Sequence, residues 1–264
     1  PVYIREDLAS EQCIAGPSMI LESIATIVVD SGWKATMRHD GALILEEVGE
    51  DQIKTYDPST RDPMHLEVFN CTFMSIAEQM GDALQRTAIS TNIRERLDFS
   101  CAIFDADGGL VANAPHIPVH LGAMGETVRA LVQRQETITP GEMFVINDPN
   151  LGGSHLPDVT VIAPVHNQEG QLIFFTANRG HHSDIGGITP GSMPPFSRHR
   201  KEEGCVFSGE VIVEKNTFNE TLMRQILSEG PTPARNPDTN IADLKAQVAA
   251  NLTGRQLLLQ LVDK

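Results

Sequence analysis

The chain has 264 residues, enough for one large domain or two modest ones, and 41% of them are hydrophobic, which is sufficient for a packed core. Its 35 acidic residues outnumber its 20 basic residues, for a formal net charge of -15 at neutral pH. Because such a chain repels nucleic-acid phosphates and anionic lipid headgroups, we expect neither nucleic acid nor a membrane as a partner. No apolar run approaches the roughly 20 residues that span a bilayer.

The four cysteines are widely separated, without a C-x-x-C pair, so we expect neither a zinc knuckle nor a dithiol redox motif. Reduced thiols in a cytoplasmic protein are the simplest interpretation. The N-terminus, Pro1–Asp7, has no signal-peptide pattern and no initiating Met, so we expect the chain to begin inside a longer one.

Residues 1–48 predict a small β module. Strands are expected at 25–29, 33–37 and 43–45, and the turn residues 39–41 predict a hairpin between the last two. An acidic stretch with two Asp-Pro pairs then predicts a linker over residues 49–62.

Residues 63–264 alternate between helical and strand patterns. An apolar stripe predicts a helix over 64–88, which we interpret as core packing. The further predicted elements are strands 98–104 and 110–112, helix 122–135, strand 143–146, the hairpin strands 159–165 and 172–176, and helices 217–228 and 240–262. The last helix is still running at Lys264, which predicts that the chain is cut there. The fold class is therefore α/β (α+β mixed): a small β module followed by a mixed sheet flanked by helices.

A first polar segment, residues 147–158, follows an apolar strand and contains a Gly pair before His155 and Asp158. Imidazole and carboxylate together suit a divalent metal such as Zn²⁺, Mn²⁺ or Fe²⁺. The alternative is a His–Asp hydrogen bond that only fixes a loop, and this segment alone favours that alternative.

A second polar segment, residues 178–187, contains His181 and His182 and begins at the end of the strand expected to pair with the one after His155. That pairing could bring the two segments together. In an extended backbone the two His side chains point to opposite faces, so one ligates more easily than both. Two His and one Asp would leave open positions for water or substrate.

A third segment, residues 113–122, carries His116 and His120 four apart. On a helix they would share a face, but Pro115 and Pro118 argue for a rigid extended loop, with His120 lining a cavity. A structural role for this segment is the alternative that its residues favour. The chain contains no phosphate-binding G-x-x-x-x-G-K-[ST] motif, so ATP is not expected to bind within it.

Several of these stretches resemble the hydantoinase B family. They are Met74–Gly81, Arg86–Ser100, Asn113–Met124, Gly152–Asp158 and Arg179–Pro195, of which the run from Asp184 to Pro195 is long and specific. Residues 1–48 resemble the C-terminal tail of a hydantoinase A-type domain, on Gly16–Glu22 and Val28–Trp33. The resemblance thus implies an A-type tail (1–48), a linker (49–62) and the N-terminal part of a B-type domain (63–264).

The fused arrangement is similar to that of 5-oxoprolinases within the family. The resemblance implies ATP-dependent hydrolysis of 5-oxo-L-proline to L-glutamate, with ATP and Mg²⁺ in the missing A-type half. In carboxylase relatives the B-type subunit holds a metal through two His and one carboxylate. Here this implies a divalent Mn, Zn or Fe at His155 and Asp158, with His181 or His182 as third ligand and His181 preferred. The candidate catalytic residues are His155, Asp158 and His120.

The family also implies the partners: a small-molecule lactam, the remainder of the hydantoinase A/B polypeptide, and a second copy in a cytoplasmic homodimer when full length. The fragment alone is expected to be inactive. Two alternatives stay open, namely a subunit of an N-methylhydantoinase or of an acetone or acetophenone carboxylase, and a non-catalytic truncated interaction module.

Overall fold

The structure is a computed structural model that describes residues 1–48, 63–135 and 137–262. The chain divides into two compact units, residues 1–61 and 62–264. The predicted linker over 49–62 lies outside the described residues, as does Lys264. All four cysteines are free. Within the described part of the chain, no helix combines the length and the apolar character needed to cross a membrane.

The first unit is built from two three-stranded sheets. One has the order β1-β3-β4 and the other the order β2-β5-β6. The strands are β1 (Val2–Ile4), β2 (Cys13–Ala15), β3 (Ser18–Leu21), β4 (Thr26–Val29), β5 (Trp33–Met37) and β6 (Leu43–Glu47), with a 3-10 turn at Arg5–Asp7. A small core between them contains Ile14, Ile20, Val29 and Ala35. The predicted hairpin of residues 33–45 is confirmed, with Gly41 at φ +81° in its turn.

The second unit contains a seven-stranded sheet in the order β13-β12-β9-β10-β11-β7-β8. Every pairing in it is antiparallel. The strands are β7 (Phe99–Asp105), β8 (Leu110–Asn113), β9 (Met143–Ile146), β10 (Asp158–His166), β11 (Leu172–His181), β12 (Ser208–Glu214) and β13 (Thr217–Phe218). The predicted β10–β11 hairpin is confirmed, and it forms the centre of the sheet.

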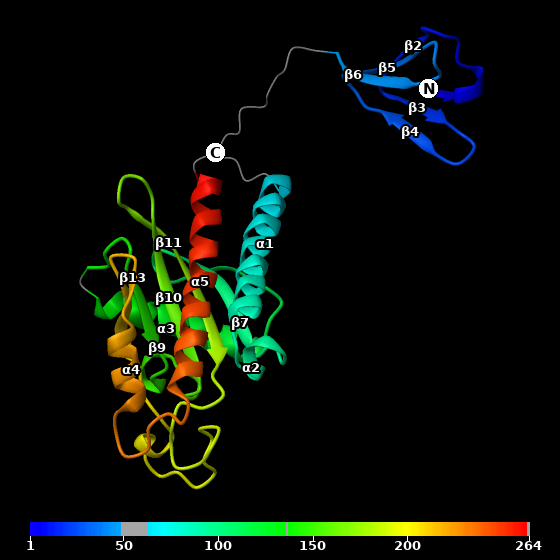
Figure 1. Ribbon diagram of the computed structural model, residues 1–264. Helices are drawn as coiled ribbons and strands as arrows, with labels where there is room; N and C mark the ends of the chain where they lie inside the picture. Colours follow the sequence, from blue (N-terminus) through cyan, green and yellow to red (C-terminus); the bar gives the residue numbers. More distant parts are fainter. Residues whose placement is uncertain (49–62, 136, 263–264) are drawn as a thin grey trace. The chain divides into compact units, whose positions relative to one another are not determined.

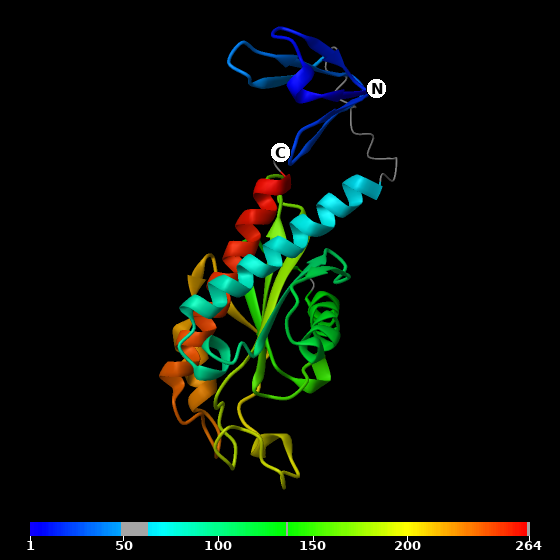
Figure 2. The same ribbon diagram turned by 90° about the vertical axis from the view of Figure 1, so that its right-hand side faces the viewer.

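Helices cover both faces of this sheet (Figures 1 and 2). The helices are α1 (Pro63–Thr87), α2 (Thr91–Arg94), α3 (Pro118–Arg134), α4 (Glu220–Ser228) and α5 (Pro237–Val262), with 3-10 turns at Pro149–Leu151 and Arg200–Glu202. In Figure 2, α1 and α5 lie together on one face and α3 lies on the other. Because both faces are covered, β7, β9 and β10 are buried along nearly their whole length and are mostly apolar, although β7 contains Ser100 and β10 contains Thr160.

The structure differs from the sequence-based elements in several places, and it also contains β1, β2, β3 and α2, for which no element was predicted. Helix α3 begins at Pro118, four residues earlier than predicted, because proline is well tolerated in the first turn of a helix. Residues 217–218 form a short strand, and α4 begins after its Asn219 cap. Strand β12 was not predicted, although its Glu-Val-Ile-Val core is rich in β-branched residues.

The apolar stripe of α1 packs only along its second half. Ile76, Met80 and Leu84 are at most 4% exposed, whereas Leu66 is 73% exposed. The interpretation of the whole stripe as core packing therefore holds for residues 76–84 but not for the first turns.

Candidate metal centre

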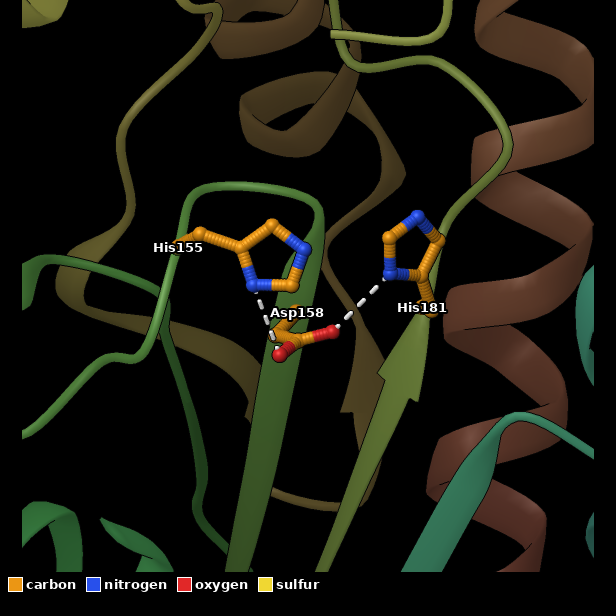
Figure 3. A group of neighbouring side chains, drawn as sticks. All are labelled: His155, Asp158 and His181. Carbon is orange, nitrogen blue, oxygen red and sulfur yellow. Dashed lines mark hydrogen bonds and ion pairs between the residues drawn. The ribbon is translucent and has the colours of Figure 1, made fainter. Parts of the chain in front are cut away.

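The first and second polar segments meet at one end of the β10–β11 hairpin. Asp158 is the first residue of β10 and His181 is the last of β11, and the two are direct partners in the antiparallel register. His155 lies on the loop that enters β10, three residues before Asp158. Figure 3 shows the rings of His155 and His181 on either side of the Asp158 carboxylate. Strand pairing therefore assembles three residues that the sequence separates into two segments.

The carboxylate of Asp158 contacts a different imidazole through each oxygen. Its Oδ2 lies 2.8 Å from His155 Nδ1, and its Oδ1 lies 3.1 Å from His181 Nδ1. The three residues each offer one ligand atom, and these atoms all lie within 4.8 Å of one another. The side chain of Asp158 is 1% exposed, whereas that of His155 is 35% exposed, so the group is open to solvent on the His155 side.

Electrostatics favour a charged carboxylate in this group. Burial by itself raises the pKa of Asp158, but hydrogen bonds from His120, His155 and His181 outweigh it and lower that pKa. The hydrogen bond to Asp158 raises the pKa of His155 against the opposing effect of burial. A permanently ionised, buried carboxylate between two imidazoles is a donor set that suits a divalent transition metal.

His120 from the third polar segment also reaches this group. It lies in the first turn of α3, is 2% exposed, and places its Nε2 3.4 Å from Asp158 Oδ1. The predicted extended loop around His120 is wrong, because Pro118 starts the helix. His116 lies before the helix, where its Nδ1 accepts a hydrogen bond from the backbone N–H of Cys101, away from the group.

Asp98 is a site residue that sequence reasoning missed. Its carboxylate oxygens lie 3.6 Å from His120 Nε2 and 3.9 Å from His181 Nδ1, and its side chain is 35% exposed. Asp98 directly precedes β7, the strand next to β11, so it reaches the same sheet end. The only sequence signal was an acidic residue at the start of a predicted strand, which is too common to single out.

His182 points to the opposite face, as the alternation of an extended strand predicts. Its Nε2 donates to Gln247 Oε1 at 3.1 Å, and its Nδ1 accepts from Asn240 Nδ2 at 3.1 Å. Both partners belong to α5. With both ring nitrogens engaged and the ring 1% exposed, His182 has no lone pair to offer a metal in this arrangement. The structure therefore brings His181 into the group and does not bring His182.

The loop that carries His155 is held by close backbone packing. A Cβ on Gly153 would lie 2.3 Å from the carbonyl oxygen of Asn147, so only glycine fits there. The buried side chain of Asn147 donates from Nδ2 to Leu156 O at 2.7 Å and to Cys205 O at 3.0 Å, and its Oδ1 accepts from Phe207 N at 2.7 Å. The loop is thus tied to the segment that leads into β12.

A cysteine and a serine, which are residue types that can act as nucleophiles, have structural roles instead. Cys101 is fully buried in β7, and burial raises the pKa of its thiol, so it is not a nucleophile. The hydroxyl of Ser192 donates to Gly186 O at 2.6 Å and accepts from Ile185 N at 2.8 Å, which fixes a turn.

Comparison of the sequence with known proteins identifies relatives of this chain. Residues 62–264 match the family model described as Hydantoinase B/oxoprolinase. The chain is 47% identical to 5-oxoprolinase 1 of Arabidopsis thaliana over 274 aligned residues, covering 100% of this chain and 22% of that protein. It is 42% identical to the 5-oxoprolinase of Saccharomyces cerevisiae, covering 97% of this chain and 21% of that protein.

A solved structure shares the fold of about three quarters of the chain. The crystal structure of the ATP-dependent caprolactamase from Pseudomonas jessenii matches with a TM-score of 0.68 and 27% identity, covering 77% of this chain and 34% of that one. The chain thus spans about a fifth of the length of the curated relatives that it matches. On the match over residues 62–264 and these identities, the chain belongs to the hydantoinase B/oxoprolinase family.

Proposed function

We propose that the chain is part of an ATP-dependent 5-oxoprolinase and that it carries a metal centre at His155, Asp158 and His181. The observation that supports this most is the convergence of these three side chains, in a chain that is 47% identical over its whole length to a 5-oxoprolinase. The donor set matches what Mn²⁺, Zn²⁺ or Fe²⁺ accepts from proteins. When bound, such an ion would polarise a carbonyl oxygen or activate water.

The proposed reaction opens the five-membered lactam of 5-oxo-L-proline. An amide is a poor electrophile, so ATP first transfers its γ-phosphoryl group to the lactam oxygen and leaves as ADP. The oxygen of a water molecule then bonds to the ring carbon, the carbon–nitrogen bond breaks, and the nitrogen takes up a proton. A second water molecule releases inorganic phosphate from the acyl group, and the product is L-glutamate. ATP and Mg²⁺ would be held by a hydantoinase A-type half.

The residues of this chain would hold ligands and move protons in that reaction. Asp158 fixes both imidazoles through its two oxygens. His120 is the proposed proton acceptor, because imidazole is the most common general base in proteins and its Nε2 lies 3.4 Å from Asp158 Oδ1 and 3.6 Å from Asp98 Oδ1. Asp98, the more exposed of these carboxylates, would orient His120 from the open side.

The proposal extends to the assembly. The substrate is a small-molecule lactam, and the partner of this chain is the remainder of a hydantoinase A/B polypeptide, which the coverage of about a fifth of the relatives supports. We also propose a cytoplasmic homodimer for the whole enzyme. The net charge of -15 supports a partner that is neither nucleic acid nor anionic membrane.

A chimeric enzyme tests the activity. These 264 residues replace the matching segment of the Saccharomyces cerevisiae 5-oxoprolinase, and ATP-dependent release of L-glutamate from 5-oxo-L-proline is measured. The chimera is expected to be active, and His155→Ala is expected to abolish turnover while the fold stays intact. His39→Ala is the matched control, because that His is 81% exposed in the first unit. A His155→Ala chimera with unchanged turnover contradicts the role of the site, and a chimera that opens only other lactams contradicts the substrate.

A further inference from the structure

Arg179 is a fully buried cation beside the candidate metal centre. It lies two residues before His181 on β11, so both side chains point to the same face of the sheet, toward α3. Its side chain is 0% exposed. Burial lowers the pKa of Arg179 to about 10, and the nearby Asp158 acts in the opposite direction, so the guanidinium stays charged at neutral pH.

Neutral oxygens hold this guanidinium. Nε donates to Thr160 Oγ1 at 2.8 Å, and Nη1 donates to Ser154 Oγ at 2.8 Å. Nη2 donates to Thr127 Oγ1 at 2.8 Å and to Gly152 O at 3.1 Å. Within residues 1–48, 63–135 and 137–262, no carboxylate forms an ion pair with Arg179. A charge buried in this way is destabilising relative to an apolar side chain, so fold stability alone does not account for it.

These hydrogen bonds connect β10 and α3 to the loop that leads into His155. Thr160 belongs to β10, Thr127 belongs to α3, and Gly152 and Ser154 belong to the loop that leads into His155. The hydroxyl of Thr127 also donates to Gly152 O at 2.8 Å, which closes a ring of hydrogen bonds between α3, the loop and Arg179. The planar guanidinium spreads its five donors over three nitrogens and so reaches partners on separate elements, whereas lysine holds its three donors on a single nitrogen.

We propose that Arg179 is a positioning residue for His155: its guanidinium clamps Gly152 and Ser154 against Thr127 and so holds the His155 ring at Asp158. The part of this inference that concerns metal binding rests on the proposed function, whereas the part that concerns the geometry of the loop does not. The clamp sets where His155 lies before any ligand binds. Loss of the clamp therefore loosens the loop in the metal-free chain and weakens metal binding in the same chain.

A matched pair of substitutions isolates the clamp. Thr127→Val keeps the side-chain shape but removes the oxygen between Arg179 and Gly152. Thr176→Val makes the same change on the opposite face of β11, where the buried Thr176 Oγ1 donates to Asn251 O at 3.2 Å. Both variants lose buried hydrogen bonding and are expected to be less stable than the parent chain. Arg179→Lys is a second variant that keeps the charge and loses the fork.

The first measurement is the order of the backbone amides of residues 152–155 by NMR relaxation in the metal-free chain. We expect order parameters near 0.85 in the parent chain and in Thr176→Val, and below about 0.6 in Thr127→Val and Arg179→Lys. The second is the Kd for Mn²⁺, which is expected to rise roughly 10- to 100-fold in Thr127→Val and Arg179→Lys only.

The outcomes separate the two proposals. Unchanged order of the loop in Thr127→Val and Arg179→Lys overturns the positioning role. An equal loss of order in the control Thr176→Val also overturns it, because that result would indicate a general loss of stability. Failure of the parent chain to bind any of Mn²⁺, Zn²⁺ and Fe²⁺ contradicts the metal centre, and the loop order then decides the role of Arg179 by itself.

Discussion

Asp158 shows how one residue can organise a site through strand register. It is a buried anion with an imidazole on each oxygen, and its register partner across β10 and β11 is one of these imidazoles. A shift of the register by one residue would replace His181 by Gly180 or His182, neither of which can face the carboxylate in the same way. The candidate site therefore depends on hairpin pairing as much as on residue type.

Asn147 is a buried residue whose amide cannot be replaced by a carboxylate of the same shape. Asn147→Asp would remove both donors and set an anion against the carbonyls of Leu156 and Cys205. We expect a loss of about 3 kcal/mol in the free energy of unfolding, measured by urea titration. Asn167→Asp is the control, because its Oδ1 only accepts, from Glu169 N and Gln171 N. Equal stability of the two variants would contradict this account of the loop.

Asp148 gives a prediction for the pH dependence of stability. Burial raises the pKa of Asp148, but hydrogen bonds from Asn150, Ser208 and Arg200 lower it below its ordinary value of 3.8. A lowered folded pKa stabilises the fold above pH 3.8, and this contribution is lost as the pH falls through the folded pKa. Asp148→Asn is expected to cost about 1 kcal/mol at pH 7, a modest value because Arg200 is partly exposed.

The measurement is denaturant unfolding of the parent chain and Asp148→Asn between pH 7 and pH 3. The difference in the free energy of unfolding is expected to stay constant down to about pH 5 and to shrink below pH 3.8. A difference that stays constant over the whole range would show that the charge of Asp148 is not what stabilises the loop.

The sequence predicts part of the site, and the missing part has a physical reason. His155 and Asp158 share one motif, and period-2 alternation of an extended chain separates His181 from His182. Asp98 and Arg179 were beyond reach, because their roles come from contacts across β7, α3 and the His155 loop. Spacing along the chain does not encode these contacts.

At the scale of elements, local sequence patterns predicted the strands that are buried along nearly their whole length. The apolar runs of β7 and β9 and the β10–β11 hairpin follow from residues that neighbour each other in sequence. The order of the strands in the sheet does not, since β9 pairs with β12 across about 60 residues. The exposure of the first turns of α1 was also not predictable, because the apolar pattern of a helix does not indicate which other element packs against it.

The packing of α1 on α5 predicts opposite effects for one substitution at two helical glycines. A Cβ on Gly254 would lie 2.4 Å from Met80 Sδ, whereas a Cβ on the exposed Gly122 would meet nothing within 4 Å. We expect Gly122→Ala to stabilise the chain by about 0.5–1 kcal/mol through helix propensity. Gly254→Ala is expected to be net destabilising by about 1 kcal/mol, because overpacking exceeds that gain. Thermal unfolding measures both, and stabilisation by Gly254→Ala would contradict close packing of these helices.

At the scale of the whole molecule, the chain consists of two compact units, and every residue of the candidate site lies in the second. Residues 63–264 alone are therefore expected to keep the secondary structure of the second unit and the same metal stoichiometry as the whole chain. Circular dichroism and elemental analysis of that shorter chain check this. Loss of metal together with retained secondary structure would show that the first unit contributes to the site.

The metal centre is tested most directly by the metal content of the purified 264-residue chain, measured by elemental analysis beside His155→Ala and the control His39→Ala. A near-stoichiometric transition metal is expected in the parent chain and in His39→Ala, and its loss is expected in His155→Ala. The absence of metal from the parent chain after reconstitution with Mn²⁺, Zn²⁺ and Fe²⁺, or its retention in His155→Ala, would contradict the metal centre. His155, Asp158 and His181 would then be hydrogen-bonding residues that fix the end of the β10–β11 hairpin.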